Sequence, residues 1–243
     1  MPEGPSILIL KEACLPFVGK RILSVSGNSK ADIEKLENQK LIELKTYGKN
    51  FFLRFKNFSV RIHLMLFGSY RINERKETAP RLALTFSNGE LNFYTCVVQI
   101  IEEDLNTLYD FERDILSDAW KPKKASASLK DMPKAMVCDV LMDQQLFAGV
   151  GNIIKNEVLY RIRVHPQSRV GKLPKKQLNA LIKEARVYSF DFLNWKQKFE
   201  LKKHWLVYKQ KTCKRCNLPI HLKPMGKTNR RTFYCNNCQI LYI

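Results

Sequence analysis

The sequence has few acidic residues and no long apolar run, and each shortage excludes a class of protein. Its 243 residues include 23 Asp and Glu against 42 Lys and Arg, which gives a formal net charge of +19. A surplus of this size attracts polyanions, and nucleic acid is the commonest of them. No run of about 18 apolar residues is present, so no membrane span and no membrane partner are expected.

A secretory signal is also missing from the first residues, which lack a basic segment and a cleavage site. We therefore expect a cytoplasmic protein, associated with the nucleoid if it is bacterial. The seven cysteines are an odd number, which argues against a closed set of disulfides. Cys14, Cys96 and Cys138 each stand alone among apolar neighbours and are interpreted as small core residues.

The other four cysteines form two close pairs near the end of the chain, Cys213-x2-Cys216 and Cys235-x2-Cys238. Four thiolates in paired CxxC turns suit tetrahedral Zn²⁺, and a site with four protein ligands has no open position for catalysis. Residues 206–243 are too few to bury a hydrophobic core of their own and need a cross-link such as this metal site. The sequence therefore predicts one structural zinc per chain, with "RTFYC" in a β-hairpin beside the second pair.

The predicted fold class is α+β with several domains. Residues 21–103 alternate apolar with polar residues, with a turn at 87–89, which predicts an antiparallel β-sandwich behind a helix that starts near Pro5. Residues 119–132 are charged and aperiodic and are interpreted as a linker. Helical spacing follows from Pro133, with a helix to about Gln145, a break at 149–151, a second helix from Asn152 and further helices at 174–187 and 189–198. We expect domains at 1–118 (sandwich), 133–205 (helical) and 206–243 (zinc finger).

The most distinctive reactive group is at the start of the chain, which reads "MPEGPS". No Ser-His-Asp set or phosphate loop is present, and the four scattered histidines, His63, His165, His204 and His221, are interpreted as structural. Removal of Met1 would leave Pro2 with a free secondary amine of pKa about 7.7–8.0, which can attack an aldehyde-level carbon and form an iminium. Glu3 could supply the protons. A proline-rich leader into the first helix is the alternative.

Four motifs in the same order carry a resemblance along almost the whole chain. They are "PEGP" at the start, "GKN" at 48–50, "AGVGNIIKNEVLYRIRVHP" at 148–166, and the four-cysteine finger with "NRRTFYC". The chain resembles the formamidopyrimidine-DNA glycosylase / endonuclease VIII family. The resemblance implies a helix–two-turn–helix domain, with Pro2 as the Schiff-base nucleophile and Glu3 as the general acid/base.

The resemblance also implies contacts to DNA. Lys49 would contact the phosphate near the damaged nucleotide, and Asn152 would hold a phosphate at the start of its helix, where an N-cap is the plainer role. Arg230, or its neighbour Arg231, would be the phosphate-binding arginine of the finger. The three consecutive residues Met65, Leu66 and Phe67 would fill the hole left by a flipped base, with a strand-end core cluster as the alternative.

The implied activity is excision of oxidised bases from damaged double-stranded DNA by a monomeric glycosylase and AP lyase, with β,δ-elimination. Ser6 departs from the acidic residue usual in the family. Residues 188–211 lack the glycine- and threonine-bearing loop of the formamidopyrimidine branch, which favours oxidised pyrimidines, the endonuclease VIII preference. The alternatives are formamidopyrimidine-type specificity, a non-catalytic zinc-finger nucleic-acid-binding protein and a structural ribosome-associated protein. A retained Met1 would block the amine.

Overall fold

The computed structural model describes residues 2–243. The chain divides into two compact units, Met1–Asp110 (unit 1) and Phe111–Ile243 (unit 2). Among the residues described, no helix is long and apolar enough to cross a membrane. The boundary expected at residue 205, between the helical domain and the finger, stays a prediction.

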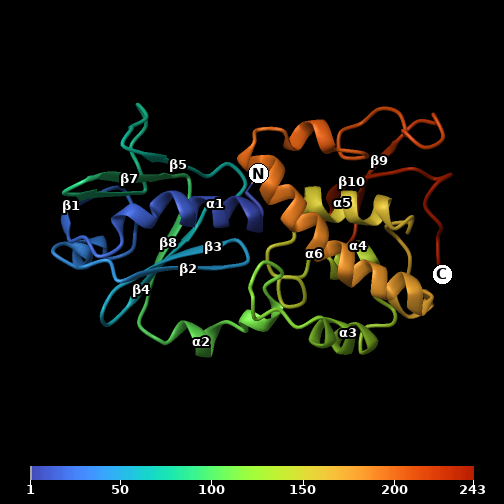
Figure 1. Cartoon of the computed structure of the whole chain (residues 1–243), viewed down its shortest axis with the longest axis horizontal. Coiled ribbons are helices and arrows are strands. Elements are labelled where there is room, and N and C mark those ends of the chain that lie inside the picture. Colours follow the sequence, from blue (N-terminus) through green and yellow to red (C-terminus); the bar gives the residue numbers. More distant parts are fainter. Residues whose placement is uncertain (1) are drawn as a thin grey trace. The chain divides into compact units, whose positions relative to one another are not determined.

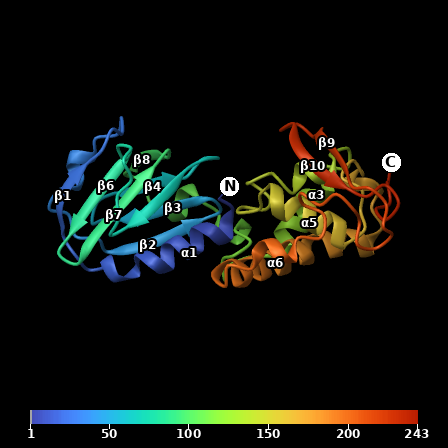
Figure 2. The same ribbon diagram turned by 90° about the horizontal axis from the view of Figure 1, so that it is seen from above.

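Unit 1 contains two α-helices and two four-stranded antiparallel sheets, with strand orders β2-β3-β4-β8 and β1-β6-β7-β5 (Figures 1 and 2). Its elements are α1 (Gly4–Cys14), β1 (Ile22–Ser26), β2 (Glu43–Tyr47), β3 (Asn50–Arg54), β4 (Ser59–His63), β5 (Ser69–Ile72), β6 (Leu82–Phe86), β7 (Gly89–Tyr94), β8 (Val97–Ile101) and α2 (Leu105–Leu108). The predicted β-sandwich behind a leading helix is confirmed, as is the hairpin turn at 87–89, which joins β6 to β7.

The core of unit 1 joins both sheets to α1. Ile7 and Leu10 of α1 are fully buried, and the helix packs on β2 and β3. Phe51 of one sheet and Phe93 of the other meet with ring centroids 6.1 Å apart. The isolated cysteines Cys14 and Cys96 belong to this core, and burial raises the pKa of their thiols to about 12 and about 11. This rigid body holds the start of α1 against the sheet formed by β2 and β3.

Unit 2 is helical and ends in a β-hairpin (Figure 1). Its elements are α3 (Pro122–Lys130), α4 (Val137–Val140), α5 (Asn152–Arg161), α6 (Lys175–Gln197), β9 (His221–Met225) and β10 (Arg230–Tyr234). The predicted hairpin around "RTFYC" is confirmed by the β9–β10 pairing. The core draws side chains from all four helices and from Met225 and Tyr234 of the hairpin, so the hairpin packs on the helices.

The segment 119–132, expected to be a linker, contains helix α3, so this expectation is wrong. Pro122 stands in the first turn of the helix, where its missing N–H costs nothing. Ala125 and Leu129, four residues apart, are buried in the core of unit 2. Two buried residues among charged and small ones give too weak a period to recognise from the sequence.

Two other helix predictions need correction, whereas the start of a helix at Asn152 is confirmed. The helix expected from Pro133 to Gln145 is only the four residues of α4. The chain then turns, and the Gln144 side chain bonds the carbonyls of Met142 and Val150. The helices expected at 174–187 and 189–198 are one helix, α6. Ser189 does not break the helix, because its hydroxyl donates a hydrogen bond to the Ala185 carbonyl at 2.7 Å.

Candidate functional site

The start of the chain places Pro2 and Glu3 directly before α1. Pro2 is half-buried, and the Glu3 side chain is completely buried. Glu3 is the N-cap residue, and its carbonyl accepts hydrogen bonds from the amides of Ser6 and Ile7 at 2.8 and 3.3 Å, while its carboxylate takes no part in the cap. The backbone is thus fixed at Glu3, directly after Pro2. Whether Met1 is removed lies outside the described residues.

Lys49 lies in the two-residue turn between β2 and β3. Gly48, the first residue of this turn, has a φ of +57°, a region that favours glycine. The side chain of Lys49 is half-buried. Figures 1 and 2 both show this turn and the N-terminus at the same end of unit 1. Three residues that the sequence implicated in chemistry or phosphate contact, at positions 2, 3 and 49, therefore belong to one end of one unit.

His63, which the sequence analysis treated as structural, also lies at this end. It pairs with Asn50 across β3 and β4, and its Nδ1 is 3.1 Å from the Asn50 side-chain oxygen. Burial, together with the charges of Arg61 and Lys49, lowers the pKa of His63. The ring is therefore neutral near pH 7 and adjoins the turn that carries Lys49. The strand register creates this proximity, and the sequence alone does not fix that register.

The triplet Met65, Leu66 and Phe67 lies on the turn between β4 and β5. Their side chains are 50%, 43% and 81% exposed, so they do not form a strand-end core cluster. The turn is tight: a Cβ on Gly68 would lie 1.9 Å from the Leu64 carbonyl oxygen, so glycine is required. Since β4 ends at His63, the triplet emerges beside the Lys49 turn. Three consecutive exposed apolar side chains are costly unless a partner covers them.

In unit 2 the start of α5 is bonded to β10. Gly151 is the N-cap of α5, and Asn152 is the first helical residue, so Asn152 does not act as an N-cap. Its side-chain amide donates to the Arg231 carbonyl at 2.9 Å, while its Oδ1 is buried and accepts no hydrogen bond within residues 2–243. Arg230 is half-buried at the start of β10, and Arg231 is exposed. The structure thus brings Asn152 and the two arginines together.

Two further residues of α5 continue these bonds along β10, and no feature of the sequence singles out either of them. Lys155 is 1% exposed and donates to the Thr232 hydroxyl at 2.8 Å. The Asn156 side chain accepts from the Phe233 amide at 2.7 Å and donates to the Asn152 carbonyl. Buried polar groups are stable only when they are hydrogen-bonded. These contacts therefore fix one position of the hairpin on the helix.

Glu157 fixes the segment that leads into the finger. Its fully buried carboxylate accepts the backbone amides of Leu206, Val207 and Tyr208 at 2.8–3.0 Å. Burial raises the pKa of Glu157, and the three amides act against this shift. The same helix therefore holds both the approach to the finger and its second strand.

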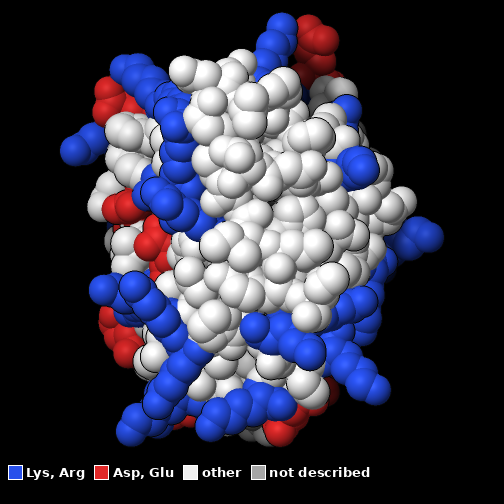
Figure 3. All heavy atoms as spheres, turned by 90° about the vertical axis from the view of Figure 1, so that its right-hand side faces the viewer, with Lys and Arg blue, Asp and Glu red and all other residues white. Residues whose placement is uncertain are grey.

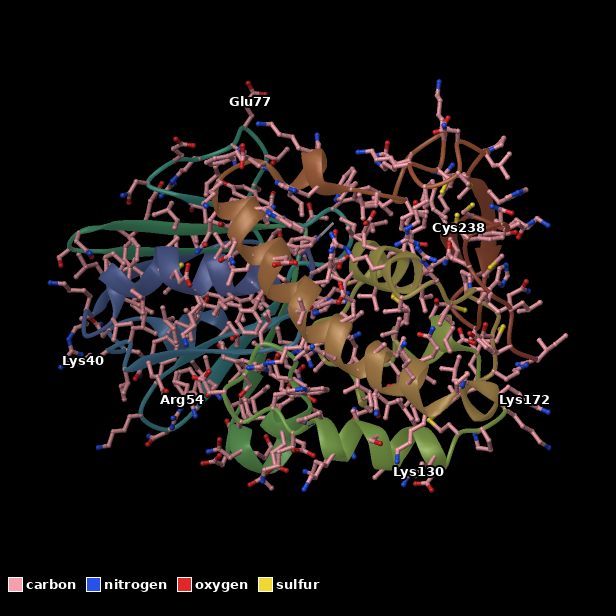
Figure 4. The ribbon with its side chains drawn as sticks, turned by 45° about the vertical axis from the view of Figure 1, so that its right-hand side comes forward. Lys40, Arg54, Glu77, Lys130, Lys172 and Cys238 are labelled. Carbon is pink, nitrogen blue, oxygen red and sulfur yellow. The ribbon has the colours of Figure 1, made fainter. Side chains whose placement is uncertain are left out.

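The four paired cysteines converge on one point beside the hairpin (Figure 4). The sulfur atoms of Cys213, Cys216, Cys235 and Cys238 all lie within 4.8 Å of one another. Cys213 and Cys238 are separated by 3.8 Å, and Cys216 and Cys235 by 3.6 Å. A tetrahedron with metal–sulfur bonds of about 2.3 Å has sulfur separations of about 3.8 Å. The cluster therefore fits a metal ion with four sulfur ligands.

The protein surroundings favour the thiolate form at one of these ligands. Burial opposes ionisation of Cys213, but hydrogen bonds from the Tyr160 hydroxyl and from two backbone amides lower the pKa of this thiol to about 6. The Tyr160 oxygen lies 3.1 Å from Cys213 Sγ. Burial, and then this contact, raise the pKa of Tyr160, so the phenol keeps its proton.

The charge of the chain is visible on its surface. Figure 3 shows Lys and Arg side chains gathered around the margins of a largely uncharged area, with few Asp or Glu among them. Such a surface attracts polyanions at a distance.

Comparisons with known proteins agree on one family. The model "Formamidopyrimidine-DNA glycosylase N-terminal domain" matches residues 1–97, and "Formamidopyrimidine-DNA glycosylase H2TH domain" matches residues 111–188. The chain is 34% identical over 205 residues to Endonuclease 8-like 3 of Mus musculus. The alignment covers 81% of this chain and 34% of that protein. The chain thus spans about a third of the length of this relative. It is 26% identical to Endonuclease 8-like 2 of Bos taurus, over 98% of this chain and 96% of the relative.

Solved structures share the fold at low identity. A viral DNA glycosylase superposes with a TM-score of 0.85 at 20% identity, over 98% of this chain and 100% of the other. The formamidopyrimidine-DNA glycosylase of Lactococcus lactis, solved non-covalently bound to DNA with an AP site, gives the same TM-score and identity over 98% and 99%. Both family models, the curated relatives and the fold agree: the chain belongs to the formamidopyrimidine-DNA glycosylase / endonuclease VIII family.

Proposed function

We propose that this protein is a bifunctional DNA glycosylase and AP lyase that excises oxidised bases and cleaves the strand through Pro2. The observation that carries the proposal is the pair Pro2 and Glu3, held against the start of α1 in a chain that matches both domains of the family. A secondary amine at the chain start has the reactivity that this chemistry needs, because its pKa of about 7.7–8.0 leaves a neutral fraction at physiological pH.

The proposed reaction begins when the Pro2 nitrogen attacks C1′ of the damaged nucleotide. The C1′–N bond to Pro2 forms as the glycosidic bond breaks, and the departing base takes up a proton. Glu3 supplies protons to the opening sugar, since its carboxyl group is the neighbouring acid. The resulting iminium withdraws electrons and acidifies C2′. Loss of the C2′ proton then expels the 3′-phosphate, and a second elimination expels the 5′-phosphate.

The DNA contacts proposed for this reaction come from both units. Lys49 in unit 1 would bind a phosphate, and Asn152 with Arg230 or Arg231 in unit 2 would do the same. The position of Asn152 in the first turn of α5 supports its role, because a helix N-terminus favours an anion. Phosphate contacts position the duplex without reading its sequence. Met65, Leu66 and Phe67 would fill the stacked space that the flipped base leaves, which their exposure supports.

We propose zinc as the metal of the four-cysteine cluster, because a closed tetrahedral set of thiolates is typical of structural zinc. Cys213, Cys216, Cys235 and Cys238 would hold it and leave no position for a substrate. The ion would supply folding energy to residues 206–243 and no chemistry. The protein would act as a cytoplasmic monomer on damaged double-stranded DNA.

Oxidised pyrimidines are the proposed substrates. The curated relatives named Endonuclease 8-like support this branch, as does the helical course of residues 189–197 at the end of α6, where a long base-cupping loop is not built. Formamidopyrimidine-type specificity is the second candidate, favoured by 26% identity to a formamidopyrimidine-DNA glycosylase of Acinetobacter baylyi over 99% of both chains.

Borohydride trapping on DNA with an abasic site or an oxidised base tests the proposal. Borohydride reduces an iminium to a stable covalent adduct, so the untagged protein should be trapped, Pro2→Gly should be trapped weakly, and an N-terminal tag should abolish trapping. Pro16→Gly is the matched control, because Pro16 is an exposed proline elsewhere in unit 1. Trapping of the tagged protein at the untagged rate would place the nucleophile elsewhere. Binding without any adduct would favour the non-catalytic zinc-finger protein.

A further inference from the structure

Tyr160, in the last turn of α5, lies between the helix and the four-cysteine cluster. Its side chain is 1% exposed and packs with Val207, Cys213 and Phe233. Its hydroxyl oxygen is 3.1 Å from Cys213 Sγ. A buried tyrosine hydroxyl needs a hydrogen-bond partner, and a metal-bound cysteine is a thiolate that can only accept. The hydroxyl therefore donates, and the sulfur accepts.

Arg215 holds the tyrosine in place from within the first CxxC turn. Its guanidinium lies over the Tyr160 ring, 4.1 Å from the ring centroid. The same group donates to the Tyr160 carbonyl at 2.7 Å and to the Arg161 carbonyl at 3.3 Å. These are carbonyls at the C-terminal end of α5, where a cation is favoured by the helix dipole. One residue between Cys213 and Cys216 thus fixes the ring and closes the helix end.

From this geometry we propose that Tyr160 is an outer-sphere residue of the metal centre, whose hydroxyl donates to the Cys213 thiolate and slows loss of the metal. The proposal rests on the metal site proposed above. Four thiolates around a divalent cation leave a net charge of −2 in a partly buried site, and a donor aimed at one sulfur reduces that excess. Outer-sphere partners of this kind typically change metal affinity by about 10- to 100-fold.

The contact is selective for one ligand. Cys213 and Cys235 are buried, whereas Cys216 and Cys238 are half-buried, and the Tyr160 hydroxyl contacts one of the two buried sulfurs, Cys213. Hydrogen bonding lowers the electron density on a sulfur and therefore its reactivity toward electrophiles. Cys213 is then the ligand that is protonated last, and metal release begins at the more exposed sulfurs. Cys213 is also the ligand that α5 contacts, through Tyr160.

The test compares Tyr160→Phe with Tyr234→Phe in the full chain. The control Tyr234→Phe also removes one tyrosine hydroxyl from the finger, but the Tyr234 ring packs against His165 and His221. Zinc content of the wild type is measured first, and then competition with a chromophoric chelator. We expect Tyr160→Phe to lose about 10- to 100-fold in zinc affinity and to release zinc faster, with Tyr234→Phe close to wild type.

Cobalt substitution gives a readout that packing alone would not move. Removing a donor from one thiolate should shift the sulfur-to-cobalt charge-transfer band in Tyr160→Phe and leave it unchanged in Tyr234→Phe. If Tyr160→Phe fails to fold, Arg215→Met serves instead. It frees the ring while keeping the hydroxyl, and should weaken zinc binding by a smaller factor.

If Tyr160→Phe folds, wild-type zinc affinity together with a wild-type cobalt spectrum would overturn the proposal. If Tyr160→Phe does not fold, wild-type zinc affinity in Arg215→Met would overturn it. A wild-type chain that binds no zinc would instead overturn the metal site itself.

Discussion

Replacing Met65, Leu66 and Phe67 together by alanine should slow excision from duplex DNA and leave the fold intact. The side chains are 50%, 43% and 81% exposed, so little of their apolar surface is buried. Full burial of such a side chain stabilises by about 1.5–3 kcal/mol, which puts the loss at about 1 kcal/mol each for Met65 and Leu66 and less for Phe67. A total of about 2 kcal/mol is well below a typical stability of about 5–15 kcal/mol.

The cost to function should be larger than the cost to stability. Unstacking a base step costs about a few kcal/mol, and apolar side chains inserted into the gap offset it. Losing about 2–3 kcal/mol from the transition state slows the reaction roughly 30- to 150-fold, since each 1.36 kcal/mol is tenfold. A single strand has no stacked gap, so its cleavage should not need the wedge.

The assay is single-turnover kinetics on two substrates, an oxidised base in a duplex and an abasic site in a single strand. Excision from the duplex should fall by that factor, while cleavage of the single strand stays within about twofold of wild type. The matched control is Leu15→Ala with Leu23→Ala, which removes two leucines that are 52% and 53% exposed elsewhere in unit 1. Equal impairment of the triple variant on both substrates would refute the wedge.

The remaining predictions concern single groups. Glu3→Gln should lose base excision about 10²- to 10⁴-fold but retain cleavage of abasic sites, whose aldehyde needs no ring opening; equal losses would remove Glu3 from acid catalysis. Chelating the metal, or Cys213→Ser, should increase hydrogen exchange in residues 206–243 and spare the sandwich; a fully ordered finger with full DNA affinity contradicts this. Lys49→Ala should lower the salt slope of DNA binding by about one, whereas Asn152→Ala should weaken excision more than binding with an unchanged slope. Folding lowers the pKa of His63, so its contribution to the stability of the fold is complete above pH 6.5 and is lost as the pH falls below that value. An NMR titration of His63 with a midpoint at or above pH 6.5 would contradict this.

The sequence predicted those features that depend on local pattern. The helix near Pro5, the hairpin at 87–89, the helix start at Asn152 and the meeting of the four cysteines are each signalled by residues close together in the chain. The features it missed depend on partners far away. Nine of the ten residues of α5 are buried, and the hydrogen bonds that allow Lys155 and Asn156 to be buried there come from β10, 77 residues further along the chain.

The same reason explains the error on helix length and why the neighbours of His63 were not predicted. Whether Ser189 ends a helix depends on whether its hydroxyl finds a carbonyl within that helix, as it does on Ala185. The neighbourhood of His63 depends on which residue of β3 lies opposite it, and alternation fixes the face of a strand but not its partner. Local chemistry therefore predicted the elements, and the register between them decided the site.

The hydrogen bonds between α5 and β10 determine which segments can be exchanged between this protein and its relatives. Asn152, Lys155 and Asn156 each meet a different position of the strand, the Arg231 carbonyl, the Thr232 hydroxyl and the Phe233 amide. A finger from another protein, joined at residue 206, would still offer main-chain partners to Asn152 and Asn156, but it would leave the buried Lys155 without its partner unless a hydroxyl stood at position 232. The finger is therefore not a portable module. The smallest segment that can be exchanged as a whole runs from the start of α5 to Cys238, because the last two cysteines of the cluster follow β10.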